Sequence, residues 1–318
     1  MYVEQGYKGN IGLWKYVPLP FMFFGMSALS LLAIYVLQID LESFMQAEIE
    51  KKGSNRFLAE SLLQFAAGLL ILWVWVRFVH KQSFRSLTTS REKVDWKRIL
   101  FSFRLWGGLT VLLTLIDVYL SPDDYVLNFD LNKFLALAAI GVLLVPLQTS
   151  FEEYFFRGYM MQGLGILTKN RWVPLLVTSV LFGLMHIANP EVVKLGYGIM
   201  VYYIGTGFFL GIMTLMDNGL ELALGFHAAN NLITALLVTA EWTAFQTNSI
   251  YKDVSEPGLG FDVLVPILVI FPIVLFLFSR RYGWKDWKQR LTGRVYSKEE
   301  FTALHDNRST LEHHPSKL

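Results

Sequence analysis

Long apolar stretches, separated by short polar segments, make up most of the chain. A transmembrane helix needs about 20 mostly apolar residues to cross roughly 30 Å of hydrocarbon. Eight stretches that are almost free of Asp, Glu, Lys and Arg approach this length. They cover residues 16–39, 61–76, 105–120, 134–151, 172–190, 195–216, 222–240 and 263–279. The pattern therefore predicts an all-α polytopic membrane helix bundle with about eight transmembrane helices.

The basic residues predict how the bundle lies in the membrane, because cytoplasmic loops carry an excess of Lys and Arg. With the N-terminus in the cytoplasm, 22 of the 28 basic residues fall on the cytoplasmic side and six on the other. An even number of spans then returns the C-terminus to the cytoplasm. In the basic tail, Trp284 and Trp287 alternate with Lys and Arg, which predicts an amphipathic segment resting on anionic lipid.

Composition supports the membrane assignment and excludes some chemistry. The chain is 53% hydrophobic and only 17% charged, whereas soluble domains carry about 25% charged residues. A net charge of +2 gives no indication of nucleic-acid binding. The absence of cysteine excludes disulfides, thiolate metal sites and a cysteine nucleophile.

Three clusters of polar residues lie in or beside the apolar stretches, where ionisable groups are costly and indicate function. They read EEYFFR at 152–157, FGLMH at 182–186 and HAANN at 227–231. Each cluster alone is compatible with an ordinary interhelical hydrogen bond or an ion pair at the end of a span. The coincidence of three clusters on three helices, within one third of the chain, favours a functional site.

Helical spacing arranges the side chains of the first cluster. Glu153 and Arg157 are four residues apart, so they share a helix face and can form an ion pair. Glu152 is turned by about 100° from Glu153 and points elsewhere. Gln148 lies one turn before Glu152.

These residue types suit the hydrolysis of an amide bond. A carboxylate and a neutral imidazole can hold and deprotonate a water molecule. A second imidazole and an amide can donate hydrogen bonds to the developing oxyanion. The same set, with Glu152, His186 and His227 as ligands, could instead hold a divalent metal such as zinc that activates the water. The His-Glu-x-x-His helix of common zinc proteases is absent, and spacing alone leaves both mechanisms open.

The motifs Glu-Glu-x-x-x-Arg, Phe-x-x-x-His and His-x-x-x-Asn, in this order and in successive membrane helices, resemble the CPBP or ABI family. This family contains the CAAX proteases and bacteriocin-processing enzymes, including the type II CAAX prenyl endopeptidases. The match covers about residues 130–245, which become the expected catalytic core with four spans. Residues 1–129 then form an N-terminal part with three spans and a basic loop at 77–104. Residues 246–279 hold the last span, and 280–318 form the basic tail.

The resemblance implies a role for each matching residue. Glu152 and His186 activate the water, His227 and Asn231 form the oxyanion site, and Glu153 with Arg157 holds the first motif in place. The family has been described both as metalloproteases and as metal-free, glutamate-dependent proteases. We favour the metal-free mechanism with no cofactor, because Glu152 has an obvious role as the base.

The expected substrate is a membrane-anchored peptide or protein, of which a prenylated CAAX-type peptide is one example. The expected location is the bacterial cytoplasmic membrane, with the lipid bilayer as the surrounding partner and no nucleic acid. The sequence leaves the oligomeric state open. Two other functions compete: a non-catalytic or immunity-type membrane protein of the same fold, and a transporter. A transporter predicts repeated halves, and residues 1–130 contain no counterpart of the motifs.

The depth of the site requires an unusual fourth helix. If that helix ended at residue 151, Glu152 would lie at the cytoplasmic face, whereas His186 would lie roughly 22 Å away from it. A helix that stays in the membrane over about residues 134–167, bent near Pro146 or Gly158, removes this conflict. The sequence thus predicts a polar cavity inside the bundle, open to the cytoplasm, in which Glu152 and His186 share a water within about 10 Å of each other.

Overall fold

Helices form most of the chain in the computed structural model, which describes residues 1–304. Residues 305–318 of the predicted basic tail lie outside this range. The α-helices are α1 (Pro18–Val36), α2 (Leu41–Lys52), α3 (Ser54–Val74), α4 (Phe84–Thr88), α5 (Trp96–Leu120), α6 (Leu131–Glu153), α7 (Met161–Thr168), α8 (Trp172–Leu184), α9 (Pro190–Leu195), α10 (Met200–Asp217), α11 (Glu221–Leu237), α12 (Phe261–Val265), α13 (Phe271–Tyr282) and α14 (Trp287–Thr292). π-Helical turns occur at Trp75–Val79, Tyr154–Met160 and Pro266–Ile270.

All eight predicted apolar stretches contain a helix. Among residues 1–304, six helical stretches are long and apolar enough to cross a membrane: Trp14–Val36, Ser54–Val79, Trp96–Leu120, Leu131–Thr168, Tyr197–Asp217 and Val263–Tyr282. The other two helices are shorter, since α8 has 13 residues and α11 has 17. The predicted all-α polytopic membrane bundle is confirmed, and the protein is an integral membrane protein.

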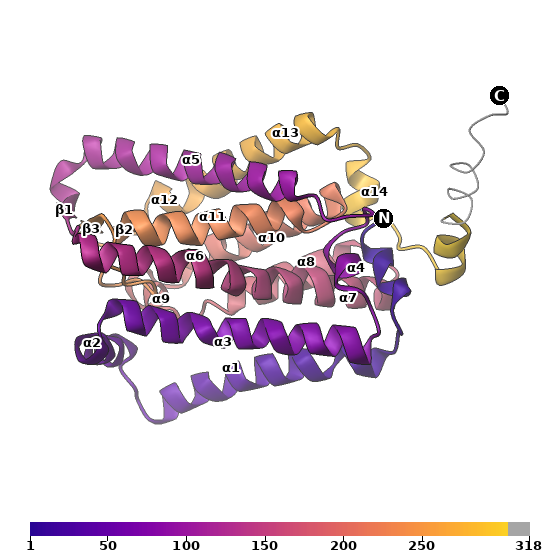
Figure 1. The fold of residues 1–318 in the computed structure, drawn as a ribbon, viewed down its shortest axis with the longest axis horizontal. Coiled ribbons are helices and arrows are strands. Elements are labelled where there is room, and N and C mark those ends of the chain that lie inside the picture. Colours follow the sequence, from indigo (N-terminus) through magenta and orange to yellow (C-terminus); the bar gives the residue numbers. More distant parts are fainter. Residues whose placement is uncertain (305–318) are drawn as a thin grey trace.

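The long helices run side by side along the longest axis of the molecule (Figure 1). Helix α11 packs against both α5 and α6, while α3 packs on α6 and α8 packs on α10. Helices α3 and α5 of the N-terminal part therefore pack directly on the helices that carry the first and third motifs, α6 and α11. The N-terminus and α14 lie at one end of the bundle, and the strands lie at the other (Figure 1).

A three-stranded sheet closes the end of the bundle opposite to the N-terminus. Strand β3 (Tyr251–Asp253) pairs antiparallel with β1 (Tyr125–Leu127) and parallel with β2 (Val238–Thr239). The apolar pattern gives no indication of these strands, because two or three residues are too few for a period-2 signal.

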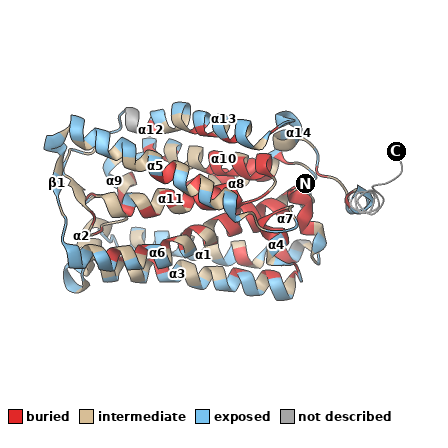
Figure 2. Ribbon diagram, turned by 45° about the horizontal axis from the view of Figure 1, so that its top comes forward, coloured by how far each residue is buried: buried red, intermediate tan, exposed pale blue. Residues whose placement is uncertain are grey.

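Burial separates an inner group of helices from an outer group that faces lipid. In an apolar window of 18 residues within Tyr197–Asp217, 56% of the residues are buried, whereas the corresponding window within Trp14–Val36 is 6% buried. Figure 2 shows the buried residues concentrated in α7, α8, α10 and α11, whereas the outer helices are largely exposed. The exposed side chains of α1 are apolar, as in Phe21 and Leu29. In a bilayer these surfaces contact acyl chains rather than water.

The fourth predicted span is one long helix, as the depth of the site requires. Helix α6, the π-helical turn Tyr154–Met160 and α7 form a continuous helical stretch, Leu131–Thr168, of 38 residues. The predicted extension of this helix to about residue 167 is therefore confirmed. Its irregular part is the π-helical turn that contains Gly158, whereas Pro146 lies within regular α-helix. π-Helical turns inside α-helices occur frequently at functional sites.

Buried charges connect three distant segments at the N-terminal end of the bundle. The Asp217 carboxylate, at the end of α10, accepts hydrogen bonds from the guanidinium groups of Arg91 and Arg98. It also accepts one from the indole N–H of Trp284, at 3.1 Å. Arg91 pairs in addition with the fully buried Glu221. The expectation that Trp284 rests on lipid is therefore wrong: this side chain is buried against Asp217, because its indole satisfies a buried carboxylate.

Candidate active site

The two glutamates of the first motif end helix α6 and occupy different environments. Glu153 is completely buried, whereas the side chain of Glu152 keeps 12% of its surface accessible. The difference follows from the rotation of about 100° between successive helical residues. Only Glu152 can therefore meet a water molecule or a substrate without a rearrangement.

Glu153 and Arg157 form the predicted ion pair inside the bundle. Arg157 Nη1 donates to Glu153 Oε1 at 3.0 Å, and neither side chain is exposed. Arg157 Nη2 donates to the carbonyl oxygen of Gly207 on α10, also at 3.0 Å. The guanidinium lies over the ring of Phe182, 4.1 Å from its centroid. A carboxylate, a carbonyl and an aromatic face thus surround the cation, although Arg157 Nε and Glu153 Oε2 have no hydrogen-bond partner among the described residues. These contacts hold the helix of the first motif against α10.

Gly207 permits a close contact between the backbones of α10 and α8. A Cβ atom at this position would lie about 3 Å or less from the backbone of Ser179, including its carbonyl oxygen. Only glycine lets the two backbones approach so closely without a shift. The carbonyl group of Gly207 is thereby placed within reach of Arg157.

His227 on α11 lies between the two glutamates. Its Nδ1 atom is 2.9 Å from Glu153 Oε1, and its Nε2 atom is 3.4 Å from Glu152 Oε2. Glu153 is paired with Arg157 and acts as an acceptor, so His227 Nδ1 carries a hydrogen and donates it. The Nε2 atom and the Glu152 oxygen then repel each other unless a proton or a water lies between them. The imidazole of His227 thus contacts both Glu153, which is paired with Arg157, and the accessible Glu152.

Asn231 joins this cluster through Gln148. Asn231 Nδ2 donates to Gln148 Oε1 at 3.0 Å, and Gln148 Nε2 donates to Glu152 Oε1 at 2.8 Å. Two further residues continue the network behind Asn231, namely Asn230 and Trp106. The sequence indicated Gln148 only as a neighbour of Glu152, and Trp106 carries no local signal because α5 lies outside the matched motifs.

His186 lies beside the cluster rather than within its hydrogen-bond network. The residue follows the last turn of α8, and its Nδ1 atom is 3.0 Å from the carbonyl oxygen of Phe182. A carbonyl only accepts, so Nδ1 carries the hydrogen and Nε2 is free to accept a proton. The ring stacks on Tyr203, with centroids 4.3 Å apart. These contacts fix both the tautomer and the plane of the ring.

The ring of Phe182 links the two histidines. Its centroid is 5.1 Å from that of His186 and 5.8 Å from that of His227. The structure thus joins five of the six predicted residues by hydrogen bonds and ion pairs, and places His186 next to them across an aromatic ring. No hydrogen bond joins His186 to Glu152 among the described residues, and their shared water stays a prediction.

The alternative metal site needs Glu152, His186 and His227 to converge on one point. Within residues 1–304, no group of three or more His, Asp or Glu side chains is arranged to hold a metal ion. The donor set in its present geometry does not fit a zinc site, which requires such ligands at about 2 Å from the metal. Metal independence itself stays a prediction.

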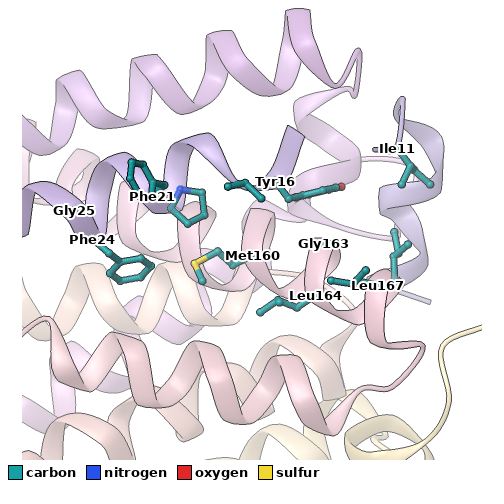
Figure 3. A pocket seen from close by; sticks show the side chains of 12 residues that line it. Ile11, Tyr16, Phe21, Phe24, Gly25, Met160, Gly163, Leu164 and Leu167 are labelled. Carbon is teal, nitrogen blue, oxygen red and sulfur yellow. The ribbon is translucent and has the colours of Figure 1, made fainter. Parts of the chain in front are cut away.

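An apolar groove of about 820 Å³ opens beside the helix that carries the first motif. Its walls are residues 11–25 on one side and 160–167 on the other, and Figure 3 shows Tyr16 and Phe24 facing Met160 and Leu164. The ring of Phe24 contacts that of Phe156, which in turn contacts Phe182. A continuous row of aromatic rings therefore separates the groove from the two histidines.

Comparisons with known proteins match the part of the chain that holds this site. The family model of the type II CAAX prenyl endopeptidase Rce1-like proteins matches residues 131–233, which include all three motifs. The uncharacterized protein YyaK of Bacillus subtilis is 32% identical over 252 residues, which cover 77% of this chain and 82% of YyaK. No solved structure matches. The chain therefore belongs to the type II CAAX prenyl endopeptidase Rce1-like family of membrane proteases.

Proposed function

We propose that this protein is an intramembrane endopeptidase that hydrolyses a peptide bond of a membrane-anchored peptide or protein. The observation that carries the proposal is the contrast between the two glutamates. Glu153 is fully buried and paired with Arg157, whereas Glu152 remains partly accessible between the amide of Gln148 and the imidazole of His227. A supported but accessible carboxylate is the group that a water-activating base requires.

The proposed mechanism needs no covalent intermediate. Glu152 takes a proton from a water molecule, and the resulting hydroxide attacks the carbonyl carbon of the scissile bond. The free Nε2 atom of His186 helps to orient this water. The amide of Asn231 donates to the oxygen that becomes negative, and His227 does so when it is protonated at Nε2, because its Nδ1 hydrogen is held by Glu153. The tetrahedral intermediate then collapses, and the proton held by Glu152 passes to the leaving amine.

A lipid-modified substrate suits the surroundings of the site. The apolar groove lies along the α7 part of the helix whose other part carries Glu152. It can hold an isoprenyl or acyl tail, and the attached peptide must pass the row of Phe24, Phe156 and Phe182 to reach the polar cluster. We place the protein in a bacterial cytoplasmic membrane, which the Bacillus relative supports, and the basic residues favour both termini on the cytoplasmic side.

A reconstituted assay tests the proposed function. Purified protein in liposomes should cleave a fluorogenic peptide that carries a C-terminal prenylated cysteine motif, and should cleave the same peptide without the lipid far more slowly. The Glu152→Ala variant should not cleave either peptide. A wild-type protein that folds, inserts and yet cleaves no lipid-anchored peptide would contradict the proposal and favour the non-catalytic or immunity-type alternative.

Removal of divalent metal should leave the activity unchanged, because Glu152 serves as the base without a bound ion. The measurement is the cleavage rate of enzyme that has been dialysed against a strong chelator, compared with untreated enzyme. A loss of activity that one equivalent of zinc restores would contradict the metal-free mechanism.

A further inference from the structure

An unbroken line of hydrogen bonds leads from the indole of Trp106 on α5 to the carboxylate of Glu152. Trp106 Nε1 donates to Asn230 Oδ1 at 3.0 Å, and Asn230 Nδ2 donates to Asn231 Oδ1 at 3.1 Å. Asn231 Nδ2 then donates to Gln148 Oε1 at 3.0 Å, and Gln148 Nε2 donates to Glu152 Oε1 at 2.8 Å. The line crosses from α5 through α11 to α6, so it spans three helices.

The chemistry of its two ends gives the line a single direction. An indole N–H can only donate, whereas an ionised carboxylate can only accept. Each of the three amides between them has one accepting and one donating end, and must therefore point its oxygen towards Trp106. If any amide were reversed, two donors or two acceptors would face each other. The orientation of every amide in the line thus follows from the donor Trp106 at one end and the acceptor Glu152 at the other.

The starting point of the line is rigid. Trp106 is only 8% exposed, and its ring packs against Phe226 with centroids 4.3 Å apart and against Phe271 at 5.9 Å. The indole consequently cannot turn away to find another acceptor. Gln148 is also buried, and hydrogen bonds in a poorly polarisable interior strengthen one another along such a line.

We propose that Trp106, Asn230 and Gln148 are positioning residues that set the direction of the amides in the catalytic cluster. This inference rests on the proposed function. The line holds Oε1 of Glu152 against a donor, so that Oε2 faces His227 and the water. It also turns the amino group of Asn231 towards Gln148 and the site. One of its two amide hydrogens is used by Gln148, and the other remains for the oxyanion.

Removal of the first donor tests the proposal. The Trp106→Phe variant keeps an aromatic ring against Phe226 but loses the N–H. Its kcat should fall about 10-fold, which is the effect expected for one hydrogen bond to a charged network, while KM changes less than about 2-fold. Trp75→Phe is the matched control, since the indole of Trp75 donates to the carbonyl of Lys15 at 3.0 Å, outside the line. The control should keep the wild-type kcat.

A double-mutant cycle separates positioning from simple packing. Gln148→Met cuts the line next to Glu152, so the further change Trp106→Phe should no longer lower kcat in that background. Two changes that act independently would instead multiply their effects. Multiplicative losses, or a wild-type kcat in Trp106→Phe, would overturn the proposal. Melting temperatures of all variants show whether a loss of kcat merely reflects unfolding.

A spectroscopic measurement tests the line of hydrogen bonds independently of any activity assay. The ¹H–¹⁵N signal of the Trp106 indole, assigned by its loss in Trp106→Phe, should shift when Glu152 is replaced by Gln. In an Asn230→Ala background, the same replacement should leave that signal in place. A shift that persists with Asn230→Ala would contradict the line. A wild-type protein without peptidase activity that shows the predicted shifts would refute only the proposed function.

Discussion

The Glu152→Gln variant is expected to lose at least about 100-fold of the peptide-hydrolysis rate, which is the typical contribution of a general base. Glutamine has nearly the same shape as glutamate, accepts the hydrogen bond from Gln148 at Oε1, and can donate to His227. It cannot accept a proton from water. The expected loss is therefore one of chemistry, with the fold and the membrane insertion intact.

The measurement is the initial cleavage rate of a lipid-anchored peptide, with the melting temperature as a check on folding. The same assay should show losses of similar size for His186→Gln and His227→Gln. Glu60→Gln is a suitable control, because Glu60 forms surface ion pairs on α3, away from the site. If Glu152→Gln hydrolyses the peptide at the wild-type rate, Glu152 is not the base.

The Glu153→Gln variant is expected to lower stability by about 3–5 kcal/mol, the usual cost of breaking one side of a buried ion pair. The change leaves the guanidinium of Arg157 without a counter-charge in a fully buried position. It also weakens the acceptor of His227 Nδ1. Activity should fall as well, but as a consequence of the disturbed cluster.

The midpoint of unfolding in mixed detergent micelles measures this effect. The double variant Glu153→Gln with Arg157→Met should be more stable than Glu153→Gln alone, because it removes the uncompensated cation together with its partner. Equal stability of the wild type and Glu153→Gln would show that the pair does not anchor α6. A double variant less stable than the single one would show that the guanidinium stabilises the fold through Gly207 and Phe182 rather than through the charge.

Helical periodicity alone was sufficient to predict much of the side-chain geometry of the first motif. Four-residue spacing predicted the pair of Glu153 and Arg157, and the rotation of about 100° per residue predicted that Glu152 points elsewhere. Both features follow from helix geometry alone. The structure confirms the ion pair and the different burial of the two glutamates, although both carboxylates lie beside the ring of His227. The long fourth helix was also predicted, because the depth of the histidines relative to Glu152 left no other arrangement.

Contacts between distant segments could not be predicted in the same way. The expected membrane contact of Trp284 was wrong, because nothing in the tail indicates that Asp217, 67 residues earlier, needs a hydrogen-bond donor. His227 was expected to be an oxyanion donor or, in the alternative, a metal ligand, and the sequence did not indicate that its ring lies between Glu152 and Glu153. Trp106 was missed because its partner, Asn230, lies 124 residues away.

The sequence by itself determined the membrane bundle, the family and the residues of the three motifs, since apolar length, helical period and charge at membrane depth are properties of short segments. Only the tertiary structure decided which side chains meet. It placed His227 between the two glutamates and connected Asn231 to Glu152 through Gln148. It also placed the ring of His186 against the rings of Phe182 and Tyr203, outside the hydrogen-bond network. These contacts depend on how α5, α6, α8 and α11 pack around one another, and the packing of helices is a cooperative property of the whole bundle that no single segment encodes.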